Sequence, residues 1–427
     1  WGNVVEFPVI FWSVMLWMTF WAVVGAVGTR RAYLKKDMDT SNAAYIGSMI
    51  GAATGPVGLI ALWLKTPETR KSLMVAPPIA AFALLAISFA FADPSNSCVT
   101  NGSFVASQIS NGIILGILYG FMALGLTLIY SILGVVSFAH GDFYMIGGMA
   151  AYYVTMVWFP GINPLFGIGF ACVSTFILGA VFERVFLTPM YDGRIDRPVE
   201  YGILVTFGLA FTLQYFIAAT VGSNPVKAKR YFDFPRLHWP SKEDPWLLKT
   251  RRGGMELFDT ITISNPRFTA AVVCILVLLM LLYFLHRTWT GKALRAVSLD
   301  REAAAITGIN PNRMNMLAFA LGGMLAALAG ALLVQAFSWL PQVGAIPAMR
   351  SFVIIVLGGL GSLPGAFVGG IIVGLVESAG TGCIPDPQKA ASYIPAYGGI
   401  VLLLTLLLRP TGLFGRRFSG GSHGKFG

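Results

Sequence analysis

The stretch Gly291-Lys-Ala-Leu-Arg-Ala-Val-Ser-Leu-Asp-Arg-Glu-Ala-Ala-Ala-Ile-Thr-Gly-Ile-Asn-Pro-Asn-Arg313 is a polar segment between two apolar ones, Ala271–Leu285 and Met314–Val334. Each flanking segment belongs to an apolar run of the length that crosses a bilayer, about 20 residues. The stretch is therefore predicted to be a loop between two spanning helices. Its alanine-rich centre indicates a short helix within that loop.

The composition extends this interpretation to the whole chain. Of the 427 residues, 56% are hydrophobic and only 11% are charged, whereas soluble domains carry about 25% charged residues. The predicted fold class is therefore all-α, a polytopic transmembrane helical bundle. The net charge of +11 is typical of basic cytoplasmic loops. Because no basic cluster with interleaved aromatic residues forms a face, a nucleic-acid partner is not expected.

Long apolar runs predict the spanning helices. They cover residues 8–28, 73–92, 108–132, 140–158, 165–186, 202–221, 267–286, 313–338, 345–361, 366–380 and 391–408. The runs 345–361 and 366–380 are short and meet at Gly361-Ser-Leu-Pro-Gly365. They are either two tilted helices joined by a tight turn, or one of them is a half-helix.

Residues 1–92 are predicted to be an N-terminal accessory membrane segment of span, proline-broken hairpin and span. The run 8–28 lacks the basic flank and cleavage site of a signal peptide, so it is expected to remain as a span. In 42–64, Pro56 interrupts the helix pattern, and basic residues flank both sides. A hairpin that enters and returns fits these flanks better than a single span.

The remaining boundaries follow from placing 287–312 in the cytoplasm. Residues 93–417 form the predicted core and 418–427 a flexible tail. Within the core, 222–266 is an external loop, and its length, proline content and Ile261-Thr-Ile263 run suggest a small folded lobe. This topology places Cys98 and Cys383 on the same outer face. They either form a disulfide in an oxidising compartment or remain two free thiols.

Few residues offer site chemistry. His140 and Asp142, with Gly141 between them, are ionisable groups near membrane depth, so they are candidates for the transport path or its gate. Asp142 can equally complement the dipole of the helix that begins near residue 140. Glu183, Arg184 and Glu377 are expected at helix ends, in interfacial positions. The four histidines are scattered and no Cys-x-x-Cys pair occurs, so no catalytic residue or metal site is predicted.

A stripe of glycines at i, i+4 and i+8 predicts close helix packing. Its members are Gly112, Gly116 and Gly120. Glycine lets the backbones of two membrane helices approach each other closely. The spacing is repeated by Gly365 with Gly369 and by Gly370 with Gly374.

Four segments together carry a resemblance to a known family. They are Ser137-Phe-Ala-His-Gly-Asp-Phe-Tyr144, Glu302-Ala-Ala with Gly308, Leu357-Gly-Gly-Leu-Gly-Ser-Leu-Pro-Gly-Ala366 and Arg409-Pro-Thr-Gly-Leu-Phe-Gly-Arg416. In this order and spacing, over about 108–417, they resemble the branched-chain amino acid ABC transporter permease family. The resemblance implies an ABC importer permease fold in the bacterial inner membrane, here with extra N-terminal transmembrane segments.

The resemblance also implies partners and a docking loop. The expected partners are ABC ATPase subunits, a second permease subunit, identical or homologous, a periplasmic or lipid-anchored solute-binding protein, and membrane lipid. The loop 287–312 would couple the permease to the ATPases. Its candidate residues are Arg295, Asp300, Glu302, Ala303, Ala304 and Gly308. Arg295 and Arg301 would contact either the partner or lipid head groups.

ATP chemistry is expected elsewhere. The chain contains no Gly-x-x-x-x-Gly-Lys-Ser/Thr motif, so ATP would be bound and hydrolysed by partner subunits, and this chain is expected to need no cofactor of its own. The implied solutes are branched-chain or other amino acids, moved by alternating access; urea or short amides are the alternative. An ion-coupled secondary transporter is a rival class. It predicts paired broken helices and buried carboxylates at the midplane, and the apolar runs of this chain contain almost none.

Overall fold

The computed structural model describes residues 102–191, 195–231, 237–239, 255–257, 261–382, 390–408 and 411–415. The predicted accessory segment 1–92, Cys98, Cys383 and the tail 418–427 lie outside these residues. The chain divides into two compact units, Trp1–Ile87 with Ile400–Pro410, and Ser88–Gly399 with Thr411–Gly427. The architecture below is that of the second unit.

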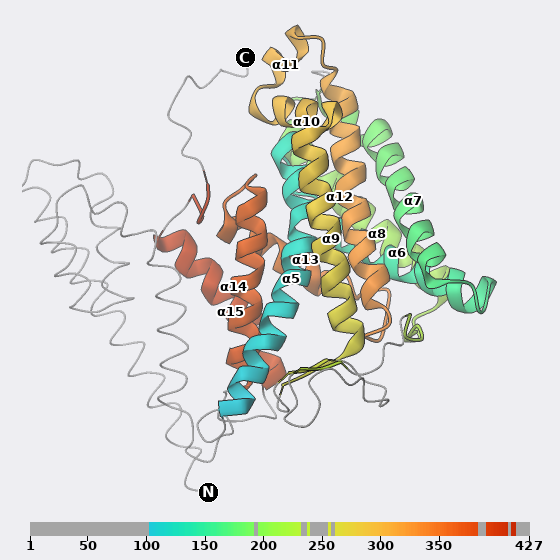
Figure 1. Cartoon of the computed structure of the whole chain (residues 1–427). Coiled ribbons are helices and arrows are strands. Elements are labelled where there is room, and N and C mark those ends of the chain that lie inside the picture. Colours follow the sequence, from blue (N-terminus) through green and yellow to red (C-terminus); the bar gives the residue numbers. More distant parts are fainter. Residues whose placement is uncertain are drawn as a thin grey trace, which may run out of the picture. The chain divides into compact units, whose positions relative to one another are not determined.

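Helices make up almost all of the described chain (Figure 1), as the apolar runs predict. Several of them, among them α7, α8, α9, α12 and α14, have proline in the first turn, where the missing N–H costs nothing. The helices are α5 (Gly102–Leu133), α6 (His140–Tyr152), α7 (Pro164–Phe182), α8 (Pro198–Val221), α9 (Asn265–Arg287), α10 (Trp289–Leu299), α11 (Arg301–Ile306), α12 (Pro311–Leu333), α13 (Ala345–Gly358), α14 (Leu363–Gly382) and α15 (Ala390–Leu408).

Short irregular turns extend two of these helices. The π-helix η3 (Tyr153–Trp158) continues α6, and the π-helix η4 (Glu183–Leu187) with the 3-10 helix η5 (Thr188–Tyr191) continues α7. Within the described ranges, six helices are long and apolar enough to cross a membrane. The chain is therefore a multi-pass membrane protein.

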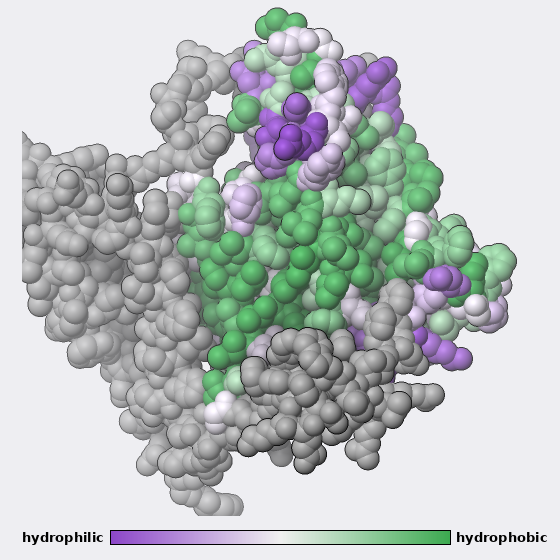
Figure 2. All heavy atoms as spheres, viewed as in Figure 1, coloured by the Kyte–Doolittle hydropathy of each residue, from purple (hydrophilic) through white to green (hydrophobic). Residues whose placement is uncertain are grey.

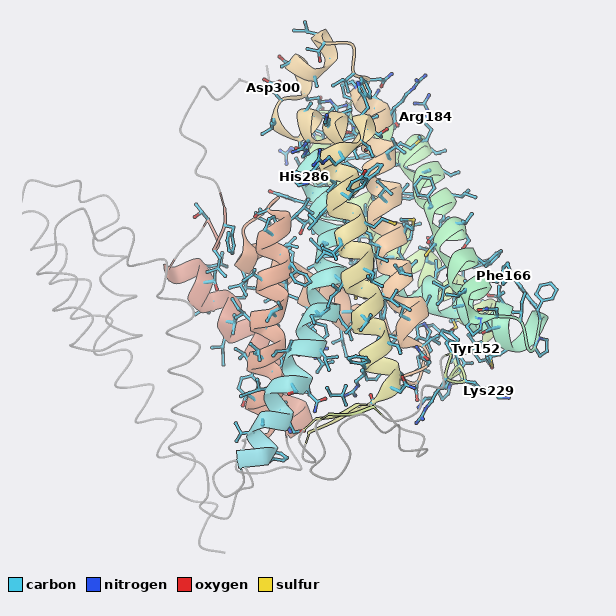
Figure 3. All side chains as sticks on the ribbon, viewed as in Figure 1. Tyr152, Phe166, Arg184, Lys229, His286 and Asp300 are labelled. Atoms are coloured by element: carbon cyan, nitrogen blue, oxygen red, sulfur yellow. The ribbon has the colours of Figure 1, made fainter. Side chains whose placement is uncertain are left out.

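The two ends of this unit differ. Helices α10 and α11 lie at one end, called here the α11 end, and three short strands lie at the other, the strand end (Figure 1). The strands β1 (Leu237–Trp239), β2 (Met255–Leu257) and β3 (Ile261–Ile263) form one sheet. β2 pairs in parallel with β1 and in antiparallel with β3. Arg184, His286 and Asp300 mark the α11 end, and Tyr152, Phe166 and Lys229 mark the strand end (Figure 3).

Close backbone contact joins α5 to α14. A Cβ atom added to Gly116 would lie 2.6 Å from Ile371 Cα, and one added to Gly120 would lie 2.9 Å from Phe367 O. From the other side, a Cβ on Gly370 would lie 2.3 Å from Gly120 Cα. Gly112 faces Gly374 in the same interface. No side chain fits between these helices, so they pack backbone to backbone.

Trp339 fixes the strand end of the bundle. Its side chain is fully buried, lies against Gly148 and Tyr144 of α6, and donates a hydrogen bond from Nε1 to Met145 O at 2.9 Å. Its backbone exchanges two hydrogen bonds with Val226. The predicted helix 313–338 accordingly ends at Leu333, because the following residues pair with the 222–231 segment.

The predicted run 345–361 is a short helix. α13 has 14 residues, about 21 Å at 1.5 Å per residue, which is less than the roughly 30 Å of a hydrocarbon core. It turns at Gly359 and Gly361, both at positive φ, and α14 follows. Each alternative left open by the sequence holds in part: a tight turn joins the two helices, and α13 is of about half the spanning length.

The outer surface between the two ends is mainly hydrophobic, and polar residues gather around α10 and α11 (Figure 2). Large exposed side chains follow the outer faces of α7, α8 and α9, among them Val173, Ile177, Leu204, Tyr215, Leu276 and Met280. An apolar band between polar ends is the surface that lipid requires.

Candidate functional site

The α10 helix is amphipathic and lies on the bundle. Thr288 caps it by accepting a hydrogen bond from Gly291 N at 3.0 Å. Ala293, Leu294 and Val297 are buried, whereas Arg295 is exposed. A helix with one buried apolar face is held firmly in place, so α10 forms a fixed support for the residues that follow it.

α11 is a single short helix with defined ends. Asp300 accepts hydrogen bonds from Glu302 N and Ala303 N at 2.9 and 3.0 Å, the usual function of an N-cap. Gly308 ends the helix at φ 86°, a conformation that glycine adopts without a steric penalty. Asn310 then caps α12, whose first residue is Pro311. The predicted short helix with its glycine terminator is therefore present.

The outer face of α11 is open. Glu302, Ala303 and Ala305 are exposed, and Ile306 is 88% exposed. Leu299, just before the helix, is 75% exposed. Ala304, by contrast, is buried against the rest of the chain. The result is a small surface of alanine methyl groups with two protruding aliphatic side chains, which no described part of the chain covers.

Arg301 points the other way, into the bundle. Its guanidinium lies 3.9 Å from the ring centroid of Tyr191, and Nη2 donates to Asn312 Oδ1 at 2.7 Å. The Asn315 amide oxygen, oriented as its hydrogen-bonding partners require, accepts from Nη1 at 2.9 Å. Tyr191 in turn donates to Leu133 O at the end of α5. The sequence predicts that Arg301 contacts either an ATPase or lipid head groups. In the structure its guanidinium instead contacts residues of this chain, Tyr191, Asn312 and Asn315.

Partial burial lowers the pKa of the Arg301 guanidinium, against the opposing effect of Tyr191 and Glu183. Arginine nevertheless keeps its charge in proteins. Arg301 is thus a permanent cation that ties α11 to α12, η5 and the end of α5.

His140 and its neighbours lie inside the membrane-spanning part of the bundle. His140 is fully buried and its Nε2 lies 2.9 Å from Met122 O. Met122 precedes the end of α5 by 11 residues, or about 16 Å along the helix. The chain therefore turns back along α5 before α6 begins.

The two residues after His140 differ in their surroundings. A Cβ on Gly141 would lie 2.2 Å from Gly344 O, so this glycine allows the starts of α6 and α13 to touch. Asp142 is in the first turn of α6 and is buried, where its carboxylate complements the helix dipole.

Glu377, which the sequence predicts near a helix end, lies five residues before the end of α14 and is buried among helices. Its side chain is 5% exposed, and its Oε1 accepts a hydrogen bond from Arg350 Nε at 3.0 Å, across the α13–α14 interface. The Arg350 guanidinium also lies 4.8 Å from the ring centroid of Tyr119 on α5. An ion pair inside the bundle therefore connects three helices.

Arg350 was not among the predicted site residues, although the sequence holds a signal for it. Arg350 and Glu377 lie at nearly equal distances from the Ser362-Leu-Pro turn. Two helices joined by a tight turn run antiparallel, so residues equidistant from the turn meet.

Glu183 directly follows the last residue of α7, at a helix end as predicted. Its side chain is fully buried, and its Oε2 lies 3.5 Å from Thr188 Oγ1. Arg184 is exposed at the α11 end (Figure 3). Within the described ranges, no group of three or more His, Cys, Asp or Glu side chains is placed to hold a metal ion.

Known proteins match most of the chain. Residues 108–409 match the family model described as "Branched-chain amino acid transport system / permease component". The high-affinity branched-chain amino acid transport system permease proteins LivH of Salmonella typhimurium (strain LT2) and of Escherichia coli (strain K12) are each 31% identical over 320 residues, 73% of this chain and 96% of LivH. BraD of Pseudomonas aeruginosa is 31% identical over 317 residues, 72% of this chain and 95% of BraD. No solved structure matches the chain.

Proposed function

Because this chain belongs to the family of branched-chain amino acid permease components, we propose that it is the membrane subunit through which an ATP-driven importer moves an amino acid. The family is one of transport subunits and not of enzymes, and its members lie in the inner membrane. The spanning helices and apolar outer surface agree with that location.

The proposed ATPase contact is the outer face of α11. The observation that carries it is the exposure of Ala303, Ala305, Ile306 and Leu299 on a helix that is capped at both ends. Exposed aliphatic side chains on a rigid support fit a groove of a partner protein. Full burial of Ile306 or of Leu299 is worth about 1.5–3 kcal/mol, and each alanine methyl adds less. Glu302 and Arg295 add polar contacts at the rim.

The proposed energy source is a partner chain. ATP is bound and hydrolysed by ABC ATPase subunits at the α11 end, and this chain holds no cofactor. A second permease subunit completes the path, and a solute-binding protein delivers the solute at the strand end. The relatives LivH and BraD are named for branched-chain amino acid transport, so we take such an amino acid as the solute.

Alternating access gives the coupling. Closure of the ATPases displaces α11, and Arg301 transmits that displacement to α12 and to the end of α5 through Asn312 and Tyr191. His140, Gly141 and Asp142 lie where α5, α6 and α13 meet, so this junction is the proposed gate.

The test is co-purification from mild detergent. The tagged chain, expressed with its native neighbours, is expected to retain an ATPase with a phosphate-binding loop, a second permease and a solute-binding protein, identified by mass spectrometry. Ile306→Glu places a charge on the proposed contact and is expected to release the ATPase. Val199→Glu, a similar change at another exposed apolar side chain, is the control. Recovery of the chain without any ATPase, or equal ATPase recovery with both variants, would contradict the proposal.

A further inference from the structure

Arg350 and Glu377 lie deep in the bundle. Arg350 packs on Tyr119 of α5. Tyr119 lies 17 residues after the first residue of α5 and 14 before the last, so it is about 20 Å or more from either end of that helix. A charged side chain in such a place is expensive, and ionisable residues within spanning helices are functional candidates by default. Neither residue has a role in the coupling proposed above.

Stability alone does not account for the pair. Taking two charges out of water costs about as much as their attraction returns, so a buried ion pair adds little net stability compared with apolar residues of the same size. The Arg350 side chain is also 20% exposed. It shares an open face of α13 with Ile346, one turn earlier, and with Met349, which are 59% and 71% exposed.

The pair leaves binding capacity unused. One nitrogen of Arg350, Nε, donates to one oxygen of Glu377, Oε1. Within the described residues, no atom accepts a hydrogen bond from either terminal nitrogen of Arg350. Those nitrogens form the fork that binds a carboxylate through two parallel hydrogen bonds. The Tyr119 ring, at 4.8 Å, holds the plane of the guanidinium in position.

We propose that Arg350 and Glu377 bind the charged backbone groups of the transported amino acid as it crosses the membrane. Arg350 takes the α-carboxylate and Glu377 takes the α-ammonium, while Ile346 offers apolar surface to the side chain. This inference rests on the proposed function and names the part of the path that recognises an amino acid.

Charge balance makes the exchange feasible. Without solute, the two side chains neutralise each other. When a zwitterion enters between them, its carboxylate replaces Glu377 as the partner of Arg350, and its ammonium group replaces Arg350 as the partner of Glu377. Every charge is therefore compensated both with and without solute. A sugar or another uncharged solute offers no such exchange. The pair therefore selects for molecules that carry both a carboxylate and an ammonium group.

The experiment measures uptake of radiolabelled leucine into vesicles that contain the complete transporter and its binding protein. Arg350→Gln and Glu377→Gln are each expected to lower the maximal rate about tenfold or more, because either change strands the opposite charge. Arg267→Gln removes an arginine of another cation–π pair, with Phe337, and is the matched control with uptake near that of the unaltered transporter.

The charge-exchanged variant Arg350→Glu with Glu377→Arg separates binding from structure. The double variant restores an ion pair. Where a single variant no longer co-purifies with the ATPase, the double variant is therefore expected to co-purify with the ATPase again. It presents the two charges in the wrong places for the solute, so uptake is expected to stay low. Recovery of uptake to more than half of the unaltered rate would show a structural pair and overturn the inference.

A second readout uses the solute instead of the protein. With the binding protein saturated in each case, labelled leucinamide, which lacks the carboxylate, is expected to be taken up at a maximal rate about tenfold or more below that of labelled leucine. Single variants that retain full uptake would overturn the inference while the ATPase-driven function stands. Absence of leucine uptake by the unaltered transporter would remove both the inference and the solute assigned under the proposed function.

Discussion

Small residues line two helix surfaces of this chain, and the chain fills only one of them. On α5, the glycines Gly112, Gly116 and Gly120 receive the backbone of α14. On α11, Ala303 and Ala305 are exposed. The α5 surface is covered by α14 of the same polypeptide, so its glycines serve helix packing. The α11 surface has no occupant among the described residues, so it is the surface on which we propose that a partner docks.

The comparison also shows what each surface can tolerate. At the α5–α14 interface a single added methyl group collides with backbone, and backbone cannot move aside as a side chain can. On α11 there is space for a larger side chain, so a substitution there changes what binds without disturbing the fold. The predictions below test this contrast.

Gly116→Leu is expected to have the largest effect. The new side chain would meet Ile371 Cα, which lies 2.6 Å from the position of its Cβ, and overpacking of this kind costs about 1–3 kcal/mol or more. Thermal unfolding of the detergent-solubilised protein should therefore shift to lower temperature, with loss of monodisperse material. Gly208→Leu is the matched control, since nothing lies within 4 Å of a Cβ at that position. Equal unfolding temperatures for the two variants would show that the interface is looser than the glycine contacts indicate.

Gly308→Val is expected to disturb coupling and not the fold. Gly308 has φ 86° with open space around it, so a valine there is strained by about 1–2 kcal/mol without any collision. The end of α11 should shift, and ATP hydrolysis should continue with little transport. The ratio of solute moved to ATP hydrolysed measures this. Gly308→Asn is the control, because asparagine adopts the left-handed conformation more readily; a valine variant with the normal ratio would remove Gly308 from the coupling surface.

Arg301→Gln is expected to have the smallest effect. It removes the contact with Tyr191 and the hydrogen bonds to Asn312 and Asn315, which together hold α11 to the bundle by about 1–2 kcal/mol. The amides of Ala303 and Ala304 should then exchange hydrogen with solvent faster. Arg295→Gln, at an exposed site on α10, should leave their exchange unchanged. Identical exchange in both variants would mean that α10 alone holds α11.

Much of this fold could be predicted because membrane helices obey simple length and composition rules. Six of the predicted spans, the short helix around Glu302, its end at Gly308 and the glycine stripe on α5 all follow from local sequence, since each depends on residues close in the chain. The family follows from four motifs in order.

The rest depends on contacts between residues far apart in sequence. Glu377 lies five residues before the end of α14, so position alone suggested an interface, and only its partner Arg350 reveals that it is buried. Arg301 stands beside exposed residues in the sequence, yet the side chain turns inward because Tyr191 and Asn312 lie behind it. The end of α12 at Leu333 likewise depends on the 222–231 segment, which supplies the backbone partner of Trp339.

Trp339 gives the strand end of the protein a built-in optical reporter. Its indole is shielded from water and bonded to a carbonyl of α6, so its emission belongs at the short-wavelength end of the tryptophan range. Any movement that separates the segment after α12 from α6 has to withdraw this ring from its seat on Gly148 and expose it. The colour of that one fluorophore, isolated by replacing the other nine tryptophans, would then follow the opening of this end of the bundle in real time.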